Sequence, residues 1–194
     1  MRGPRLVALA VGTQSALVAA AVGGGLLAGV PVTWGEPVRG LLLGGLAAAG
    51  LAGANLALLR VPVSGWWLVD GVRHVYRDVL VPLFGRLSRP GLVVVGLSAG
   101  VGEEWLFRGL LQPLTGWVAA SLLFGLAHVA SPRMLAFGVW AACMGLALGG
   151  LAIVAGGVIA PMVAHGVYDV LALAYIRRDA SRPPTGEAGG GGRS

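Results

Sequence analysis

Two adjacent glutamates and an arginine interrupt an apolar part of the chain, in the sequence GEEWLFRG at residues 102–109. Between residues 91 and 162, the only other arginine, lysine, aspartate or glutamate is Arg133. Three more residues that can bind or transfer protons lie in apolar surroundings: His128, His165 and Asp169. A carboxylate and two imidazoles can deprotonate water, stabilise an oxyanion and protonate a leaving amine. These residue types can therefore supply what amide hydrolysis needs, and in a membrane they can also build a proton relay.

The spacing of these residues predicts how they are arranged on helices. Glu104 and Arg108 are four residues apart, as are His165 and Asp169, so each pair shares one helix face and can interact within its own helix. Glu103 points about 100° away from Glu104 around the same helix. We therefore expect adjacent glutamates with different roles: Glu104 paired with Arg108, and Glu103 facing a cavity as the candidate base.

The composition predicts a membrane protein. Of the 194 residues, 56% are hydrophobic and 11% are charged, whereas a soluble domain has about 25% charged residues. Ionisable groups at mid-bilayer cost at least about 2.5 kcal/mol each, so those that occur are expected to meet in one polar pocket. Stretches without a charged residue are long enough to reach the roughly 20 residues that cross a bilayer core; the stretches are 6–32, 40–59, 109–132 and 134–164.

The predicted fold is all-α: a polytopic membrane helix bundle with about six transmembrane helices and one amphipathic interfacial helix. The crossings are expected at roughly 6–30, 39–59, 91–112, 115–130, 134–155 and 157–176. Gln14 and Asn55 are expected to form hydrogen bonds between helices. The chain divides into two N-terminal transmembrane helices, an amphipathic segment, a four-helix catalytic core and a disordered cytoplasmic tail, at residues 1–60, 61–90, 91–178 and 179–194.

The amphipathic segment has apolar residues at helical spacing from Leu68 to Leu83, opposite a face with two aspartates and two arginines. This pattern indicates either a helix in the cytoplasmic interface, with Trp66 and Trp67 at headgroup level, or a short helix that covers the bundle. The sequence favours the two equally.

The arginines predict the orientation in the membrane. The net charge is +6, and every basic residue apart from the histidines is an arginine. With a cytoplasmic N-terminus, only Arg39 falls outside, Arg108 lies within the membrane, and all the others are inside: Arg2, Arg5, Arg60, Arg73, Arg77, Arg86, Arg89, Arg133, Arg177, Arg178, Arg182 and Arg193. We therefore expect a multi-pass cell-membrane protein with both termini in the cytoplasm, whose positive charge faces anionic lipid and does not bind nucleic acid.

Three motifs resemble those of the CPBP intramembrane proteases, a family that includes the CAAX prenyl endopeptidases and the bacteriocin-processing and immunity proteins of the Abi group. They are EEWLFR at 103–108, FGLAH at 124–128 and HGVYD at 165–169, which are similar to EExxxR, FxxxH and HxxxN/D. The motifs stand in the family's order on successive apolar segments. The resemblance covers roughly residues 90–178, and the first two predicted helices match no motif.

The resemblance implies a role for each motif residue. Glu103 matches the glutamate that, with His128, activates water for attack on a peptide carbonyl. Glu104 and Arg108 match residues that support the site, whereas His165 and Asp169 match the pair that stabilises the oxyanion. The best-understood eukaryotic-type members have asparagine where residue 169 is aspartate, and an ionised aspartate cannot donate a hydrogen bond to an oxyanion. Asp169 would then be protonated, orient His165 or bind a metal.

The expected function is an intramembrane endopeptidase, either glutamate-dependent or a metalloprotease, acting on CAAX-type prenylated peptides or other small membrane-associated peptides. Glu103, His128, His165 and Asp169 could bind zinc as well as work without it, so the cofactor stays open. The expected partners are a peptide or lipidated peptide and the lipid bilayer. The alternatives are a non-catalytic scaffold or bacteriocin-immunity protein of the same fold and a proton-coupled transporter.

Overall fold

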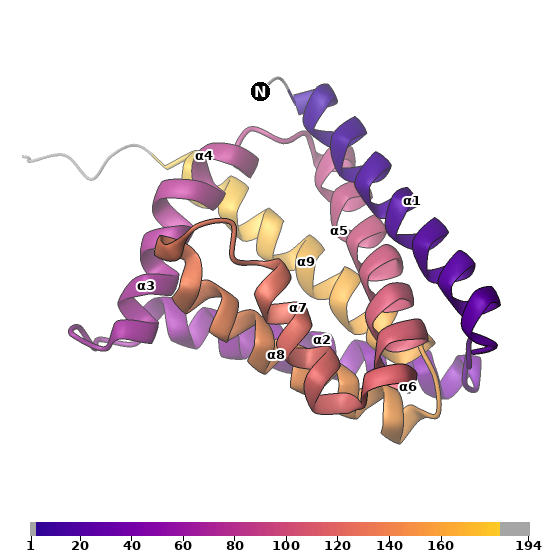
Figure 1. The fold of residues 1–194 in the computed structure, drawn as a ribbon. Coiled ribbons are helices and arrows are strands. Elements are labelled where there is room, and N and C mark those ends of the chain that lie inside the picture. Colours follow the sequence, from indigo (N-terminus) through magenta and orange to yellow (C-terminus); the bar gives the residue numbers. More distant parts are fainter. Residues whose placement is uncertain (1–2, 183–194) are drawn as a thin grey trace, which may run out of the picture.

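A computed structural model describes residues 3–182 of the chain, and this part is built of helices without strands (Figure 1). The all-α helix bundle expected from the sequence is therefore confirmed. Most of the tail expected to be disordered lies outside the described residues. The elements are α1 (Gly3–Ala28), α2 (Pro37–Arg60), α3 (Trp67–Val75), the π-helix η1 (Tyr76–Leu80), α4 (Val81–Phe84), α5 (Arg89–Glu104), the π-helix η2 (Trp105–Leu111), α6 (Gln112–Thr115), α7 (Trp117–Ala127), the 3₁₀ turn η3 (Pro132–Met134), α8 (Leu135–Ala155) and α9 (Ile159–Ala180).

Four helical segments of the described part are long and apolar enough to cross a membrane: α1, α2, η3 with α8, and α9. The expected crossing at 91–112 falls in a helical run of three joined segments, α5, η2 and α6, from Arg89 to Thr115. The expected crossing at 115–130 is wrong in length. Its helix α7 has 11 residues, about 16 Å at 1.5 Å per residue, against a bilayer core of about 30 Å.

The short length of α7 has a local cause at each end. Gly116, with φ of 87°, separates it from α6 in a backbone conformation that favours glycine. At the other end His128 is the C-cap, with φ of −92° and ψ of 2°, and the chain turns before η3. His128 is therefore at a helix end, and the chain turns directly after it.

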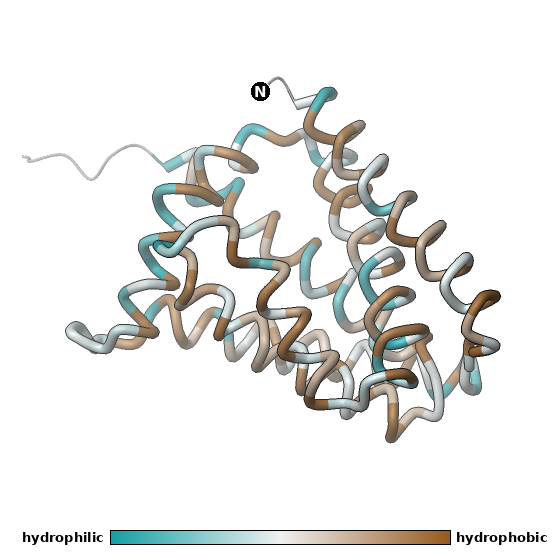
Figure 2. Tube along the Cα trace, in the orientation of Figure 1, coloured by the Kyte–Doolittle hydropathy of each residue, from teal (hydrophilic) through white to brown (hydrophobic). Residues whose placement is uncertain are grey.

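Helix α9 is the centre of the bundle and packs against α2, α5 and α8 (Figure 1). Helix α7 packs on α8, and α1 packs on the outer side of α5. Close approach of α5 to α9 depends on Gly100, where an added Cβ would lie 2.5 Å from the backbone nitrogen of Gly166. Figure 2 shows hydrophilic positions that interrupt the otherwise hydrophobic α5 and α9 in the interior of the bundle.

The amphipathic segment forms α3, η1 and α4. Val69, Val72 and Val75 are buried, and α3 packs on α8, so this helix covers the bundle. The side chains of Trp66 and Trp67 are 67% and 58% exposed, as the interfacial interpretation also expects. Burial of the valine face confirms the covering helix, and its position at the headgroups stays a prediction.

Capping residues fix the starts of two helices. Glu36 accepts hydrogen bonds from the backbone nitrogens of Arg39 and Val38 at the start of α2, and these bonds lower the pKa of Glu36. Ser88 caps the start of α5 by accepting a hydrogen bond from the backbone nitrogen of Gly91. The helix that carries the two glutamates therefore begins at a defined residue, which sets the depth of Glu103 and Glu104 in the bundle.

Candidate active site

Three helices bring the six predicted site residues together. Helix α5 and the π-helix after it supply Glu103, Glu104 and Arg108, and α9 supplies His165 and Asp169. His128 comes from the end of α7. Short distances between the side chains connect all six. The expected single polar pocket is therefore present.

Glu104 is the centre of a fully buried network. Its Oε1 accepts hydrogen bonds of 2.8 Å from both Arg108 Nη1 and His165 Nδ1. Arg108 also donates to the backbone carbonyl of Gly145 on α8, at 2.8 Å, and its guanidinium carbon lies 4.7 Å from the ring centroid of Phe124 on α7. One carboxylate and one guanidinium thus join α5, α7, α8 and α9. The predicted Glu104–Arg108 pair is confirmed.

Hydrogen bonds orient both imidazoles with the same nitrogen toward the cavity. His128 Nδ1 lies 2.8 Å from the backbone carbonyl oxygen of Phe124, and His165 Nδ1 lies 2.8 Å from the carboxylate of Glu104. The carbonyl oxygen of Phe124 can only accept a hydrogen bond, and so can the Glu104 carboxylate that pairs with Arg108. Each Nδ1 therefore carries a proton. Nε2 of each histidine is therefore the nitrogen that can accept a proton in the neutral ring.

Glu103 faces these two nitrogens. Its Oε2 lies 3.9 Å from His128 Nε2 and 4.0 Å from His165 Nε2. These distances are too long for direct hydrogen bonds, and a single water molecule between the atoms could contact them. Oε2 is buried and has no hydrogen-bond partner among the described residues, whereas Oε1 accepts a 2.9 Å hydrogen bond from Gln14 Nε2 on α1. One oxygen of Glu103 is thus held and the other is free for chemistry.

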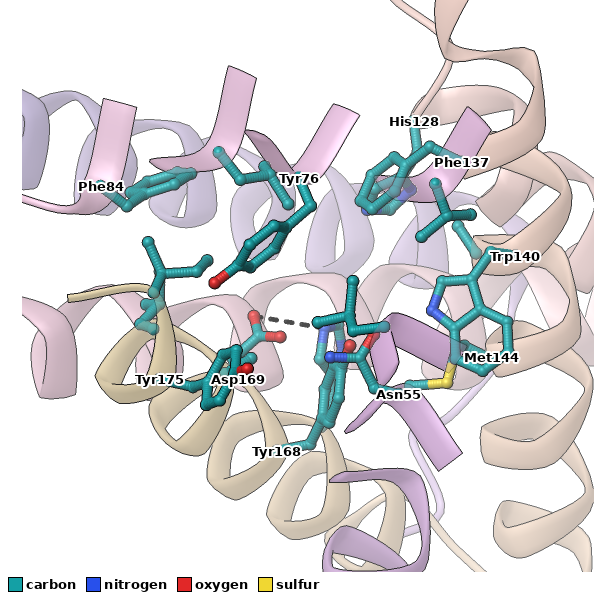
Figure 3. A pocket seen from close by; sticks show the side chains of 18 of the residues that line it. Asn55, Tyr76, Phe84, His128, Phe137, Trp140, Met144, Tyr168, Asp169 and Tyr175 are labelled. Carbon is teal, nitrogen blue, oxygen red and sulfur yellow. Dashed lines mark ion pairs between the residues drawn. The ribbon is translucent and has the colours of Figure 1, made fainter. Parts of the chain in front are cut away.

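Asp169 lies near the same nitrogen of His165 that Glu103 faces. Its Oδ2 is 3.6 Å from His165 Nε2, drawn as the dashed line in Figure 3. This distance is that of an ion pair and is longer than a hydrogen bond. The hydrogen bond expected within this i, i+4 pair is therefore absent, since His165 Nδ1 bonds to Glu104 and Nε2 faces the cavity.

A cavity of about 270 Å³ adjoins the polar residues. Glu103, His128, His165 and Asp169 line it, whereas the buried Glu104 does not. This difference confirms the distinct surroundings expected for the two adjacent glutamates. Most of the remaining wall is aromatic or aliphatic (Figure 3), and it includes Tyr76, Phe84, Phe137, Trp140, Met144, Tyr168 and Tyr175. A molecule in the cavity would contact the polar groups at one part and apolar side chains elsewhere.

The described residues do not fit a metal ion in this arrangement. No group of three or more histidine, cysteine, aspartate or glutamate side chains in residues 3–182 is placed to hold one. The nitrogens and oxygens of the four residues that could have bound zinc approach one another at 3.6 to 4.0 Å, somewhat farther apart than the roughly 3.3 Å between the ligand atoms of a tetrahedral zinc ion.

Sequence reasoning did not assign Gln14 to the site, although it expected a hydrogen bond between helices. Its partner could not be identified because Gln14 and Glu103 are 89 residues apart and no motif links their helices. The backbone carbonyls of Phe124 and Gly145 were also missed, since every residue has a carbonyl and no side chain marks the one that is used. Phe124, the motif phenylalanine of FGLAH, packs on Phe107 and also lines the cavity.

Comparison with known proteins supports the resemblance. Residues 85–171 match the family model described as type II CAAX prenyl endopeptidase Rce1-like. This match confirms the likeness to CAAX prenyl endopeptidases that the three motifs indicate, and it supports a function of the intramembrane protease kind. The apolar helices and this family together identify a membrane protein.

A curated relative is the uncharacterized protein YpbD of Bacillus subtilis (strain 168), which is 29% identical over 106 residues. The aligned part is 54% of this chain and 56% of the relative, so the chain spans about half the length of that protein. No solved structure matches the chain.

Proposed function

We propose that this protein is an intramembrane endopeptidase in which Glu103 and His128 activate water for attack on a peptide bond. The observation that carries this proposal is the free Oε2 of Glu103, which is buried and faces Nε2 of two imidazoles at 3.9 and 4.0 Å. A water molecule between them would contact a carboxylate and an imidazole that can both accept its proton. The match of residues 85–171 to the endopeptidase family supports the same chemistry.

The proposed reaction begins when Glu103 Oε2 takes a proton from this water while His128 Nε2 helps to orient it. The water oxygen forms a bond to the carbonyl carbon, and the π electron pair moves to the carbonyl oxygen. The C–N bond then breaks, and Glu103 returns the proton to the leaving amine. A carboxylate that first accepts and then donates one proton balances the hydrolysis.

His165 is proposed to stabilise the oxyanion. When protonated, it can donate from Nε2 to the developing charge while Nδ1 stays bonded to Glu104, at 2.8 Å. The Glu104–Arg108 pair is proposed to orient His165, because it fixes the position of the accepting oxygen. Asp169, 3.6 Å from His165 Nε2, is proposed to stabilise the protonated ring, a role that does not require it to donate a hydrogen bond.

The substrate is proposed to be a CAAX-type prenylated peptide or another small membrane-associated peptide. The cavity supports this class because polar groups occupy one part of its wall and aromatic or aliphatic side chains most of the rest. A peptide bond beside an apolar group would match both surfaces. The enclosing helices also place the reactive groups inside the bundle, away from bulk water.

We propose a multi-pass orientation in the cell membrane with both termini in the cytoplasm. A second hollow brings together the start of α1, the turn before α5 and the end of α9, and four arginines line it: Arg86, Arg89, Arg177 and Arg178. Arg60, at the end of α2, lies 5.7 Å from the ring centroid of Tyr175 and so belongs to the same end of the bundle. This grouping of arginines is typical of a cytoplasmic face.

The test is cleavage of short and prenylated peptides by the purified wild-type protein and by Glu103→Gln. Wild-type protein is expected to cleave at least one peptide, and Glu103→Gln to lower kcat by about 10²-fold or more, because the base is lost. Glu36→Gln is the matched control, since Glu36 caps α2 outside the cavity; it should cleave like wild type. Unchanged cleavage by Glu103→Gln would contradict the proposed base.

Further measurements separate the proposed mechanism from a metalloprotease, a scaffold and a transporter. Chelator should leave cleavage unchanged for the proposed mechanism, whereas loss that zinc restores would establish a metalloprotease. If folded wild-type protein cleaves no peptide, the scaffold or immunity interpretation replaces the protease. Proton flux in liposomes that depends on Glu103 would instead identify the transporter.

A further inference from the structure

We infer that Gln14, on α1, is a positioning residue for Glu103. Gln14 Nε2 donates a hydrogen bond of 2.9 Å to Glu103 Oε1. Helix α1 lies outside the residues that match the endopeptidase family, so this contact adds a residue to the site that the family match does not cover. The inference rests on the proposed function, because it assigns Gln14 a part in preparing the base of that reaction.

The bond decides which oxygen of Glu103 is available. A carboxylate can rotate and present either oxygen to the cavity. The amide of Gln14 holds Oε1 on the side of α1, and this leaves Oε2 facing Nε2 of both histidines, at 3.9 and 4.0 Å. Because Oε2 has no partner among the described residues, this bond to Oε1 is the contact that sets the rotation of the carboxylate.

The packing of α1 on α5 places the amide there. Gly102 precedes Glu103, and a Cβ at Gly102 would lie 2.4 Å from Gln14 Oε1 and 2.9 Å from the Gln14 backbone oxygen. Any larger residue at Gly102 would displace the glutamine. The absence of a side chain at 102 thus lets α1 approach closely enough for a glutamine to reach the neighbouring glutamate.

The amide of Gln14 is only partly satisfied by its contact with Glu103. Gln14 Oε1 is buried and has no hydrogen-bond partner in the described part of the chain. A buried amide with an unsatisfied oxygen weakens a helix interface compared with an apolar residue of the same shape. The amide donates a hydrogen bond to Glu103, and an apolar side chain at residue 14 could not.

The chain contains a matched control. Gln112 Nε2 also donates across helices, to the backbone carbonyl of Gly149 at 3.1 Å, and its Oε1 is likewise buried without a partner among residues 3–182. Gln112 has no contact of this kind with Glu103. Gln14→Met and Gln112→Met therefore remove the same chemical group from similar surroundings, and only the first removes the bond to Glu103.

The experiment compares wild type, Gln14→Met and Gln112→Met by three measurements: thermal unfolding, kcat and KM for a cleaved peptide, and the infrared carboxylate band of Glu103. Subtracting the spectrum of Glu103→Gln identifies that band. The two methionine variants should unfold at similar temperatures. Gln14→Met should lower kcat by about 10²-fold, the scale of a misplaced catalytic group, with KM within about twofold, and should shift the Glu103 band. Gln112→Met should resemble wild type in kcat, KM and the band.

A Gln14→Met protein that keeps the wild-type kcat and the wild-type Glu103 band would overturn the inference. The infrared measurement does not need a substrate. If wild-type protein cleaves nothing, the proposed function fails, and the Glu103 band of Gln14→Met still decides whether Gln14 sets the carboxylate. The two failures are therefore distinguishable.

Discussion

The buried Glu104–Arg108 pair should be strongly coupled, and a double-mutant cycle can measure this coupling. The two side chains are 0% and 1% exposed and are joined by a hydrogen bond of 2.8 Å. Removing one partner of such a pair leaves an uncompensated charge in an apolar interior. Each of Arg108→Met and Glu104→Gln is therefore expected to lower the free energy of unfolding by about 3–5 kcal/mol.

The double variant should lose less free energy of unfolding than the two single variants lose in sum. With Glu104→Gln and Arg108→Met combined, neither a carboxylate nor a guanidinium stays buried without a counter-ion. The costs that remain are the unpaired carbonyl of Gly145 and the weaker bond to His165. We expect the sum of the single effects to exceed the double effect by about 2–3 kcal/mol, the upper part of the range for contacting residues.

The assay is equilibrium unfolding in mixed micelles, followed by far-ultraviolet circular dichroism. Hydrogen bonds between membrane helices contribute about 0.6 kcal/mol on average. A coupling of that size would show that the pair acts as an ordinary hydrogen bond and would refute the reasoning from buried charge. Arg133→Met, at an exposed position, should change the free energy of unfolding by less than about 0.5 kcal/mol.

Two other predictions concern the packing that places His128 and the orientation in the membrane. Gly125→Ala should lower the free energy of unfolding by about 1–3 kcal/mol and reduce peptide cleavage. The added Cβ would lie 2.5 Å from the Gly138 backbone oxygen and would push α7 away from α8. Gly45→Ala is the control and should change neither quantity, because a Cβ at Gly45 would meet nothing within 4 Å. In a background without the native cysteine, Ser181→Cys should react with an impermeant maleimide only from the cytoplasmic side, and Thr33→Cys only from the other side; the reverse labelling would contradict the proposed topology.

Contacts within a single helix were predictable from the sequence. The i, i+4 spacing identifies the Glu104–Arg108 pair, and the 100° step between neighbours separates Glu103, which lines the cavity, from Glu104, which does not. Helix geometry alone determines these relations, so no knowledge of the tertiary fold is needed.

Contacts between helices could not be predicted in the same way. The hydrogen bond from His165 to Glu104 takes the place of the one expected between His165 and Asp169. It exists because α5 and α9 approach closely at Gly100, and spacing along one helix does not contain that information. The shortness of α7 was missed for a related reason: an apolar stretch gives the maximum length of a crossing, whereas the end of the helix at His128 depends on local backbone geometry.

The two adjacent glutamates show why the site is larger than its motifs. Arg108 and His165 hold Glu104 in the core, and both residues lie within the family match at 85–171. Glu103 needs the opposite, one free oxygen in a cavity and one held oxygen, and the holding group comes from α1. The three motifs together contain every side chain of the first arrangement and only half of the second. The matched residues 85–171 therefore contain the buried pair but not the group that holds the proposed base, so the N-terminal helix belongs to the proposed catalytic unit.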